Sequence, residues 1–99
     1  MKEVTVAELK EILKGSKKTV VLDVRQQAEF DAGHIEGSIL IPLDQLPGRF
    51  QELSKDVDIV VACRSGGRSA RAVDFLELQG FTRVANLVGG NLQWQAESC

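Results

Sequence analysis

Cys63 and the five residues that follow it form the stretch of this sequence best suited to chemistry. The cysteine comes directly after the apolar run 59–62 and precedes a short loop, which consists of Arg64, Ser65, Gly66, Gly67 and Arg68. Cysteine attacks as a thiolate, a form that nearby positive charge and N–H donors stabilise. The two glycines allow the backbone to curl without Cβ clashes, so that loop N–H groups can converge on an anion. The pattern predicts a reactive cysteine in an anion cradle.

A helix is expected to begin near Ser69, which directs its positive N-terminus toward Cys63. Surroundings of this kind bring the pKa of a cysteine from about 8.5 to between about 3.5 and 7.5. Arg68 is expected to hold the loop and its anion, whereas Arg64 either meets the substrate or faces solvent. Ser65 and Ser69 can donate hydroxyls to the anion, and Ser69 can equally cap the helix. The alternative is that Cys63 is a small buried core residue.

Strand-like and helix-like segments alternate along the rest of the chain. Two β-branched runs, 19–24 and 58–62, lack polar alternation and predict strands buried on both faces, and two shorter strands are expected at 39–41 and 84–87. Helices are expected after the capping box at Thr5, at 27–32, at 46–53, from about residue 69 to Gly80, and after Gly89. Gly15 is expected to end the first helix in a left-handed conformation.

This alternation predicts an α/β fold in which a mostly parallel central sheet has helices on both faces. Ligands of such sheets bind beyond the carboxyl ends of the strands, which is where Cys63 lies. With 99 residues, 43% of them hydrophobic and 26% charged, we expect a single domain over 1–99 and a monomer.

The composition also limits the kinds of partner and the cellular location that we expect for this protein. A net charge of −2 gives no electrostatic case for nucleic acid, and no apolar run is long enough for a membrane span. The N-terminus lacks the apolar segment of a secretory signal, so the expected location is the cytoplasm, where Cys63 stays reduced. Cys99 is the second cysteine, and we expect a frayed terminal thiol there rather than one that forms a disulfide with Cys63.

Four segments together resemble the rhodanese family of sulfurtransferases. They stand in the family's order and at its usual spacing. The segments are Leu22-Asp23-Val24-Arg25 with Glu29-Phe30, Gly33-His34-Ile35-x-Gly37-Ser38-Ile39-x-Ile41-Pro42, Cys63-Arg64-Ser65-Gly66-Gly67-Arg68-Ser69, and Leu87-x-Gly89-Gly90-x-x-x-Trp94. The resemblance implies the rhodanese fold, with Cys63 as the sulfur carrier and the backbone of residues 63–68 as the anion cradle.

The resemblance further implies a double-displacement reaction. The thiolate of Cys63 takes the outer sulfur of a donor such as thiosulfate, forms a persulfide, and passes the sulfur to cyanide, a thiol or a partner protein. No metal or organic cofactor is expected. Asp23, Arg25 and Glu29 are expected to form a buried or half-buried polar network, and His34 to tie a structural turn rather than serve as a catalytic base.

Two other functions compete with sulfur transfer. Cysteine-dependent phosphatases place five residues between the cysteine and the arginine, whereas four residues separate Cys63 from Arg68, and Ala62 stands where many of those enzymes have histidine. The shorter loop is expected to be too tight for a tetrahedral phosphoryl group. A binding module that keeps the fold without catalysis is the other alternative, but such family members generally lose the cysteine.

Overall fold

The computed structural model describes residues 1–98 and shows strands and helices in alternation. The strands are β1 (Glu3–Val4), β2 (Thr19–Asp23), β3 (Ile39–Leu40), β4 (Asp58–Ala62) and β5 (Val84–Leu87). The helices are α1 (Val6–Lys14), α2 (Gln27–Ala32), α3 (Leu46–Arg49), α4 (Gly67–Leu78) and α5 (Gly90–Glu97). Two 3₁₀ turns, η1 (Leu43–Gln45) and η2 (Phe50–Glu52), flank α3. The predicted α/β class is confirmed.

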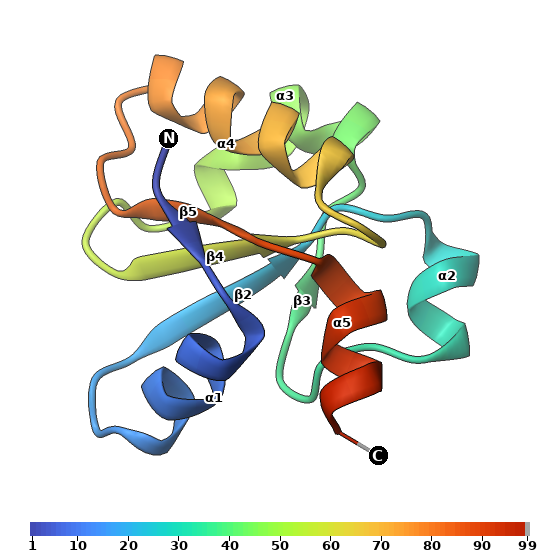
Figure 1. Ribbon diagram of the computed structural model, residues 1–99. Helices are drawn as coiled ribbons and strands as arrows, with labels where there is room; N and C mark the ends of the chain where they lie inside the picture. Colours follow the sequence, from blue (N-terminus) through green and yellow to red (C-terminus); the bar gives the residue numbers. More distant parts are fainter. Residues whose placement is uncertain (99) are drawn as a thin grey trace.

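The described strands form one parallel sheet in the order β1-β5-β4-β2-β3. In Figure 1, α3 and α4 cover one face of the sheet, and α1 and α5 lie on the other. β4 lies between β5 and β2, and its last residue, Ala62, pairs with Asp23 of β2. The residue after β4 therefore leaves the sheet at the centre of its carboxyl edge, which is where a ligand reaches an open parallel sheet.

Two apolar clusters hold the layers together, because successive strand residues point to opposite faces. On the α3 and α4 side, Leu22 and Val61 pack with Leu76. On the α1 and α5 side, Val21 and Val60 pack with Leu9. Both faces of β2 and β4 are thus buried, which explains why these strands read as continuous apolar runs rather than alternating ones.

Four local features differ from the expectations. β1 was not predicted, because two residues carry no pattern and the strand exists through its pairing with β5. Gly15 ends α1 at φ −77°, outside the left-handed region. The predicted helix at 46–53 is a four-residue helix between two 3₁₀ turns. α4 begins at Gly67, two residues before Ser69, so part of the expected loop is helical.

Within residues 1–98, no helix combines the length and the apolar character needed to cross a bilayer.

Candidate active site

Cys63 lies between the end of β4 and the start of α4, with no exposed surface. The N–H of Gly66 donates to its sulfur over 3.1 Å, and the Ser69 hydroxyl oxygen lies 3.3 Å from that sulfur. Gly66 is the N-cap of α4 and has φ +118°, a conformation that side chains with a Cβ rarely adopt. The glycine is therefore what allows the chain to turn back and direct N–H groups at the sulfur.

The pKa of Cys63 is set by two opposing effects. Burial raises it, but the hydrogen bonds that the thiolate form accepts from the Ser69 hydroxyl and from the backbone N–H groups of Ser69, Gly66 and Ser65 outweigh burial and hold the pKa below its usual value. The sequence predicted the direction of this shift. The main lowering causes are the donors of the loop rather than the arginine charges, so the backbone shape of residues 63–69 is what favours the thiolate.

Ser69 is buried and belongs to a small hydrogen-bond chain under the loop. Its hydroxyl donates to Oδ1 of Asn86 over 2.5 Å, and Nδ2 of Asn86 donates to the Gly66 carbonyl over 3.3 Å. Ser69 is thus not the helix cap, a position that Gly66 occupies. Sequence reasoning missed Asn86, although one polar residue inside the buried strand β5 was a usable signal, since buried polar groups need partners.

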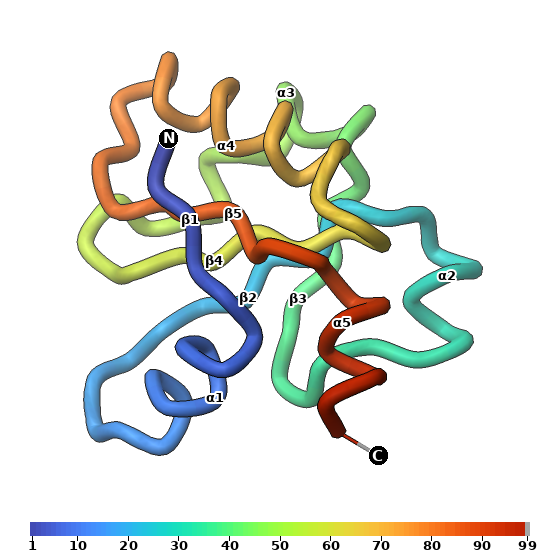
Figure 2. Tube along the Cα trace, in the orientation of Figure 1, coloured from blue at the N-terminus to red at the C-terminus, as the bar shows by residue number. Residues whose placement is uncertain are grey.

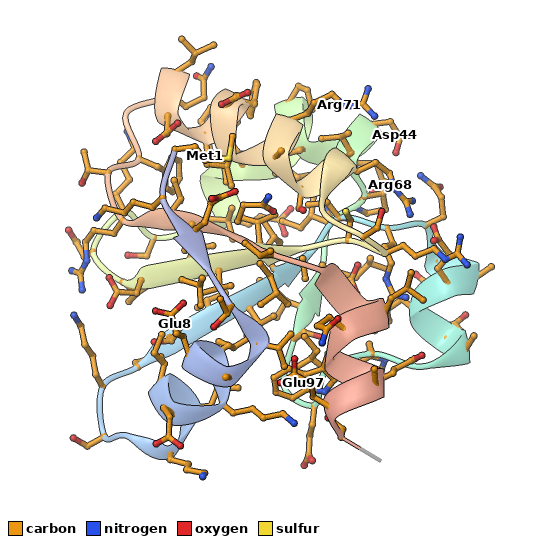
Figure 3. The ribbon with its side chains drawn as sticks, viewed as in Figure 1. Met1, Glu8, Asp44, Arg68, Arg71 and Glu97 are labelled. Atoms are coloured by element: carbon orange, nitrogen blue, oxygen red, sulfur yellow. The ribbon has the colours of Figure 1, made fainter. Side chains whose placement is uncertain are left out.

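Arg68 connects the start of α4 to α2. Its Nη1 and Nη2 donate to the two carboxylate oxygens of Glu29 over 2.7 and 2.9 Å. Hydrogen bonds from Arg68 and from the Gln26 N–H lower the pKa of Glu29 to about 2. Figure 3 shows the labelled Arg68 at the end of α4 that faces α2. Arg68 was expected to hold the loop, and its ion pair with Glu29 does so by fixing the start of α4. Its expected contact with an anion stays a prediction.

Asp23 and Arg25 form a separate, buried ion pair at the end of β2. Nε and Nη2 of Arg25 donate to the Asp23 carboxylate at 2.8–3.0 Å, and Nη2 also donates to the Gly33 carbonyl over 2.8 Å. The expected polar network with Glu29 is therefore held by charge and not by hydrogen bonds: the charge of Arg25 helps to lower the pKa of Glu29, but no hydrogen bond joins the two among residues 1–98. Glu29 binds Arg68, because α2 carries it toward α4 rather than toward Asp23.

Asn91 on α5 joins the buried pair to the backbone of Cys63. With its amide oriented to satisfy both neighbours, Nδ2 donates to the Cys63 carbonyl over 2.8 Å and Oδ1 accepts from Nη2 of Arg25 over 3.2 Å. The Asn91 backbone N–H also donates to the Cys63 carbonyl over 2.8 Å. Figure 2 shows the trace of the loop after β4 passing the beginning of α5. Asn91 was not predicted from the sequence.

Gly90 is required for this close approach of α5 to the loop. It has φ +57°, and a Cβ at this position would collide with the Cys63 carbonyl oxygen and lie 2.6 Å from that of Arg64. A side chain at residue 90 would therefore push α5 away from the loop. The close approach is thus the physical reason for glycine at position 90.

Arg64 is the cation of the loop that is left open to solvent. Among residues 1–98, no side chain or backbone group pairs with its guanidinium, and the residue is exposed. It borders a cavity of about 310 Å³ beside the loop, whose other lining residues are Arg25, Glu29, Ala32, Gly33, Asn91, Leu92 and Gln95. A larger cleft of about 410 Å³, which includes Thr19 and Ile59, lies at the amino ends of the strands, away from Cys63.

His34 follows α2 and makes local contacts. Its Nδ1 lies 2.8 Å from the Phe30 carbonyl, to which it must donate, and its ring stacks on Phe30 at 3.7 Å. The structure thus gives His34 a place in the turn after α2, and no contact with Cys63. Ser65 is exposed, and Cys99 lies outside the described residues.

Comparison with known proteins decides the family. The sequence model of the family described as Rhodanese-like domain matches residues 5–97 of this chain. This chain belongs to the rhodanese-like domain family.

Its relatives include a protein from Allochromatium vinosum named Sulfurtransferase, which is 37% identical over 93% of this chain and 86% of its own length. The Arabidopsis thaliana protein named Thiosulfate sulfurtransferase 16, chloroplastic, is 36% identical over 74% of this chain and 71% of its own. The crystal structure of a rhodanese-related protein from Thermoplasma volcanium is 35% identical and superposes with a TM-score of 0.90 over 98% and 93% of the two chains. These relatives support sulfur transfer as the general activity of this rhodanese-like domain.

Proposed function

We propose that this rhodanese-like domain carries sulfane sulfur on Cys63. In the first step the Cys63 thiolate attacks the outer sulfur of thiosulfate or a related donor. A new S–S bond forms to Sγ, the old S–S bond breaks, and sulfite leaves with the bonding electron pair. The product is a Cys63 persulfide whose negative charge lies on the outer sulfur.

The observation that carries the proposal is the position of Sγ. It is buried at the amino end of α4, within hydrogen-bond distance of the Gly66 N–H and the Ser69 hydroxyl. This arrangement suits an anion at or just beyond the sulfur, because N–H groups and a helix N-terminus both favour negative charge. The lowered pKa of Cys63 favours the thiolate form that the attack needs.

In the second step a thiolate acceptor, either a small thiol or a partner protein, attacks the outer sulfur, and the Cys63 thiolate leaves.

Arg64 serves the first step. Its free guanidinium lies at the rim of the 310 Å³ cavity, where it can attract an anionic donor and balance the charge of the departing sulfite. Within residues 1–98, no three His, Cys, Asp or Glu side chains gather to hold a metal, and the reaction as written requires none.

Phosphoryl transfer fits the same loop less well. A phosphatase of this type needs an arginine that wraps the phosphoryl oxygens, and both guanidinium ends of Arg68 are already bound to Glu29. The loop also spans four residues between Cys63 and Arg68, one fewer than those enzymes use. We therefore propose sulfur, not phosphate, as the transferred group.

Intact-mass measurement after incubation of the reduced protein with thiosulfate tests the proposal. We expect an adduct of about 32 Da, one sulfur atom, on the wild type, and its loss after addition of a thiol, which takes the sulfur as its own persulfide while the Cys63 thiolate leaves. The controls are Cys63→Ser, which should stay unmodified, and Cys99→Ser, which should load like the wild type. An adduct that persists in Cys63→Ser or depends on Cys99 would contradict the assignment of Cys63. Turnover of p-nitrophenyl phosphate without any sulfur adduct would favour the phosphatase.

A further inference from the structure

The Ser69 hydroxyl has one hydrogen and two neighbours that can accept it. Its oxygen lies 2.5 Å from Oδ1 of Asn86 and 3.3 Å from the Cys63 sulfur. A hydroxyl donates a single hydrogen bond, so it serves fully only one of the two at a time. All three side chains are buried, so water does not readily replace a missing donor.

The orientation of the Asn86 amide follows from its other contact. The amide group that lies 3.3 Å from the Gly66 carbonyl must be Nδ2, because a carbonyl oxygen only accepts. Oδ1 therefore faces Ser69 and must receive its hydrogen. The remaining contact, between Sγ and the Ser69 oxygen, then has the thiol S–H as donor. In the arrangement seen here the three groups form one chain, from Cys63 to Ser69 to Asn86.

When the thiol loses its proton, the sulfur changes from a hydrogen-bond donor to a hydrogen-bond acceptor. The thiolate is an acceptor only, and hydrogen bonds to an ionised acceptor are about twice as strong as neutral ones. Ser69 must turn toward the sulfur to serve the thiolate, and Oδ1 of Asn86 is then left buried without its donor. In the persulfide the charge moves to the outer sulfur, so the Ser69 hydrogen can return to Asn86.

We propose that Asn86 is a positioning residue of the Cys63 site that competes with the sulfur for the Ser69 hydrogen. This competition favours the Cys63 thiol and the Cys63 persulfide over the Cys63 thiolate that carries no transferred sulfur. The part that concerns the persulfide rests on the proposed function. The part that concerns the thiol needs only the geometry of the three side chains.

The charged groups around Cys63 cannot produce the expected change in the apparent pKa of Cys63. They are Arg64 and Arg68 on the loop and α4, the Asp23–Arg25 pair at the end of β2, and Glu29 on α2. Guanidinium groups keep their charge in proteins, and Glu29, with a pKa of about 2, is ionised throughout the neutral and alkaline range. A titration in that range that responds to Asn86 therefore reports the sulfur itself.

The test is the pH dependence of the alkylation rate by iodoacetamide, measured by intact mass in the full chain with Cys99→Ser. Asn86→Leu keeps the approximate size of the side chain and removes the competing acceptor. We expect it to lower the apparent pKa of Cys63 by about one unit, a tenfold larger thiolate population at pH values below the transition. An unchanged or raised value would overturn the proposal, since an apolar neighbour alone disfavours a thiolate.

The double-variant cycle with Ser69→Ala separates proton competition from a general change of the loop. Ser69→Ala alone should raise the apparent pKa of Cys63. Adding Asn86→Leu to Ser69→Ala should then leave that pKa unchanged, because no hydroxyl remains to be released. If the lowering persists without Ser69, the effect acts through the Gly66 contact and the proposal is wrong.

Where Asn86→Leu does not fold, as judged by circular dichroism, Asn86→Asp replaces it. The carboxylate holds the Ser69 hydrogen more strongly, so it should raise the apparent pKa more in the presence of Ser69 than in Ser69→Ala. Equal shifts in the two backgrounds would overturn the proposal.

The two half-reactions give a second readout. A thiolate of lower pKa is a weaker nucleophile and a better leaving group, so at pH values above the transition Asn86→Leu should load from thiosulfate roughly threefold more slowly for each unit of lowering. Its persulfide should discharge to a thiol faster than that of the wild type, and parallel losses in both steps would contradict the assignment. A wild type that does not load from thiosulfate would refute the proposed donor, and the alkylation profile would still decide the role of Asn86.

Discussion

Replacing Glu29 by glutamine removes the charge that pairs with Arg68 and keeps most other contacts of the side chain. Glutamine has nearly the same shape, and its amide oxygen can still accept from the Gln26 N–H in the capping box at the start of α2. The substitution therefore isolates the charged, two-point link between α2 and α4.

The size and the pH dependence of the effect follow from the pKa of Glu29. The pKa is lowered from 4.5 to about 2, first by the hydrogen bonds from Arg68 and then by the one from Gln26. At about 1.4 kcal/mol per unit this shift sets a ceiling of about 3 kcal/mol on the contribution of the charge to the free energy of unfolding. The two side chains are 30% and 32% exposed, so solvent screening reduces the expected loss to about 1–2 kcal/mol. Because the folded-state pKa is the lower one, this stability is present above about pH 4.5 and lost as the pH falls toward 2.

Urea unfolding of the wild type and of Glu29→Gln, followed by circular dichroism from pH 7 down to about pH 2, measures this loss directly. We expect the two stability curves to lie furthest apart at neutral pH and to approach each other below about pH 4.5. The matched control is Glu52→Gln, which removes the charge from the Arg49–Glu52 pair three residues apart on an exposed surface. A loss at pH 7 no larger than that of the control, or a difference that does not shrink on acidification, would refute the reasoning.

The remaining predictions concern the rim of the site and the contact of α5 with the loop. Arg64→Ala should reduce the second-order rate of loading from thiosulfate roughly three- to tenfold at low salt, because the free guanidinium attracts the dianion. The deficit should narrow as salt rises, and a salt-independent deficit would show a role other than charge attraction. Gly90→Ala should lower the free energy of unfolding by more than about 1 kcal/mol, since it combines positive φ with a backbone collision. Gly48→Ala, where a Cβ meets nothing within 4 Å, is the control and should be close to neutral.

The parts of the fold that the sequence predicted are those in which local pattern and packing agree. The runs that became β2 and β4 are apolar on both faces, and the capping box of Thr5 and Glu8 is present in the structure as expected. β1 escaped prediction because Glu3 and Val4 are in a strand only through their pairing with β5. No local signal marks a two-residue strand whose hydrogen bonds come from a segment more than eighty residues away.

The candidate site divides in the same way. Cys63, its glycines and the direction of its pKa follow from local rules about loops and helix N-termini, and these were predicted. The pairing of Arg68 with Glu29 joins residues 39 positions apart and depends on α2 lying against the start of α4. The same holds for Asn86 and Asn91, which reach the loop from β5 and α5. Spacing along the chain cannot show which polar side chains the strand order brings together.

These distant contacts have a consequence for how a buried thiolate is available for chemistry. In the proposed reaction, the loop presents the same N–H groups to a thiolate, to a donor and to a persulfide whose charge lies one bond further out. A mobile loop would lose conformational entropy each time it assembled that cradle, whereas a rigid one is organised in advance. Three contacts hold it: Arg68 to Glu29 at the start of α4, Asn91 to the Cys63 carbonyl, and Asn86 to the Gly66 carbonyl. Within residues 63–69, the Ser69 hydroxyl has two alternative acceptors, so under the proposed competition the change of charge on the sulfur is met by rotation of this hydroxyl rather than by movement of the backbone.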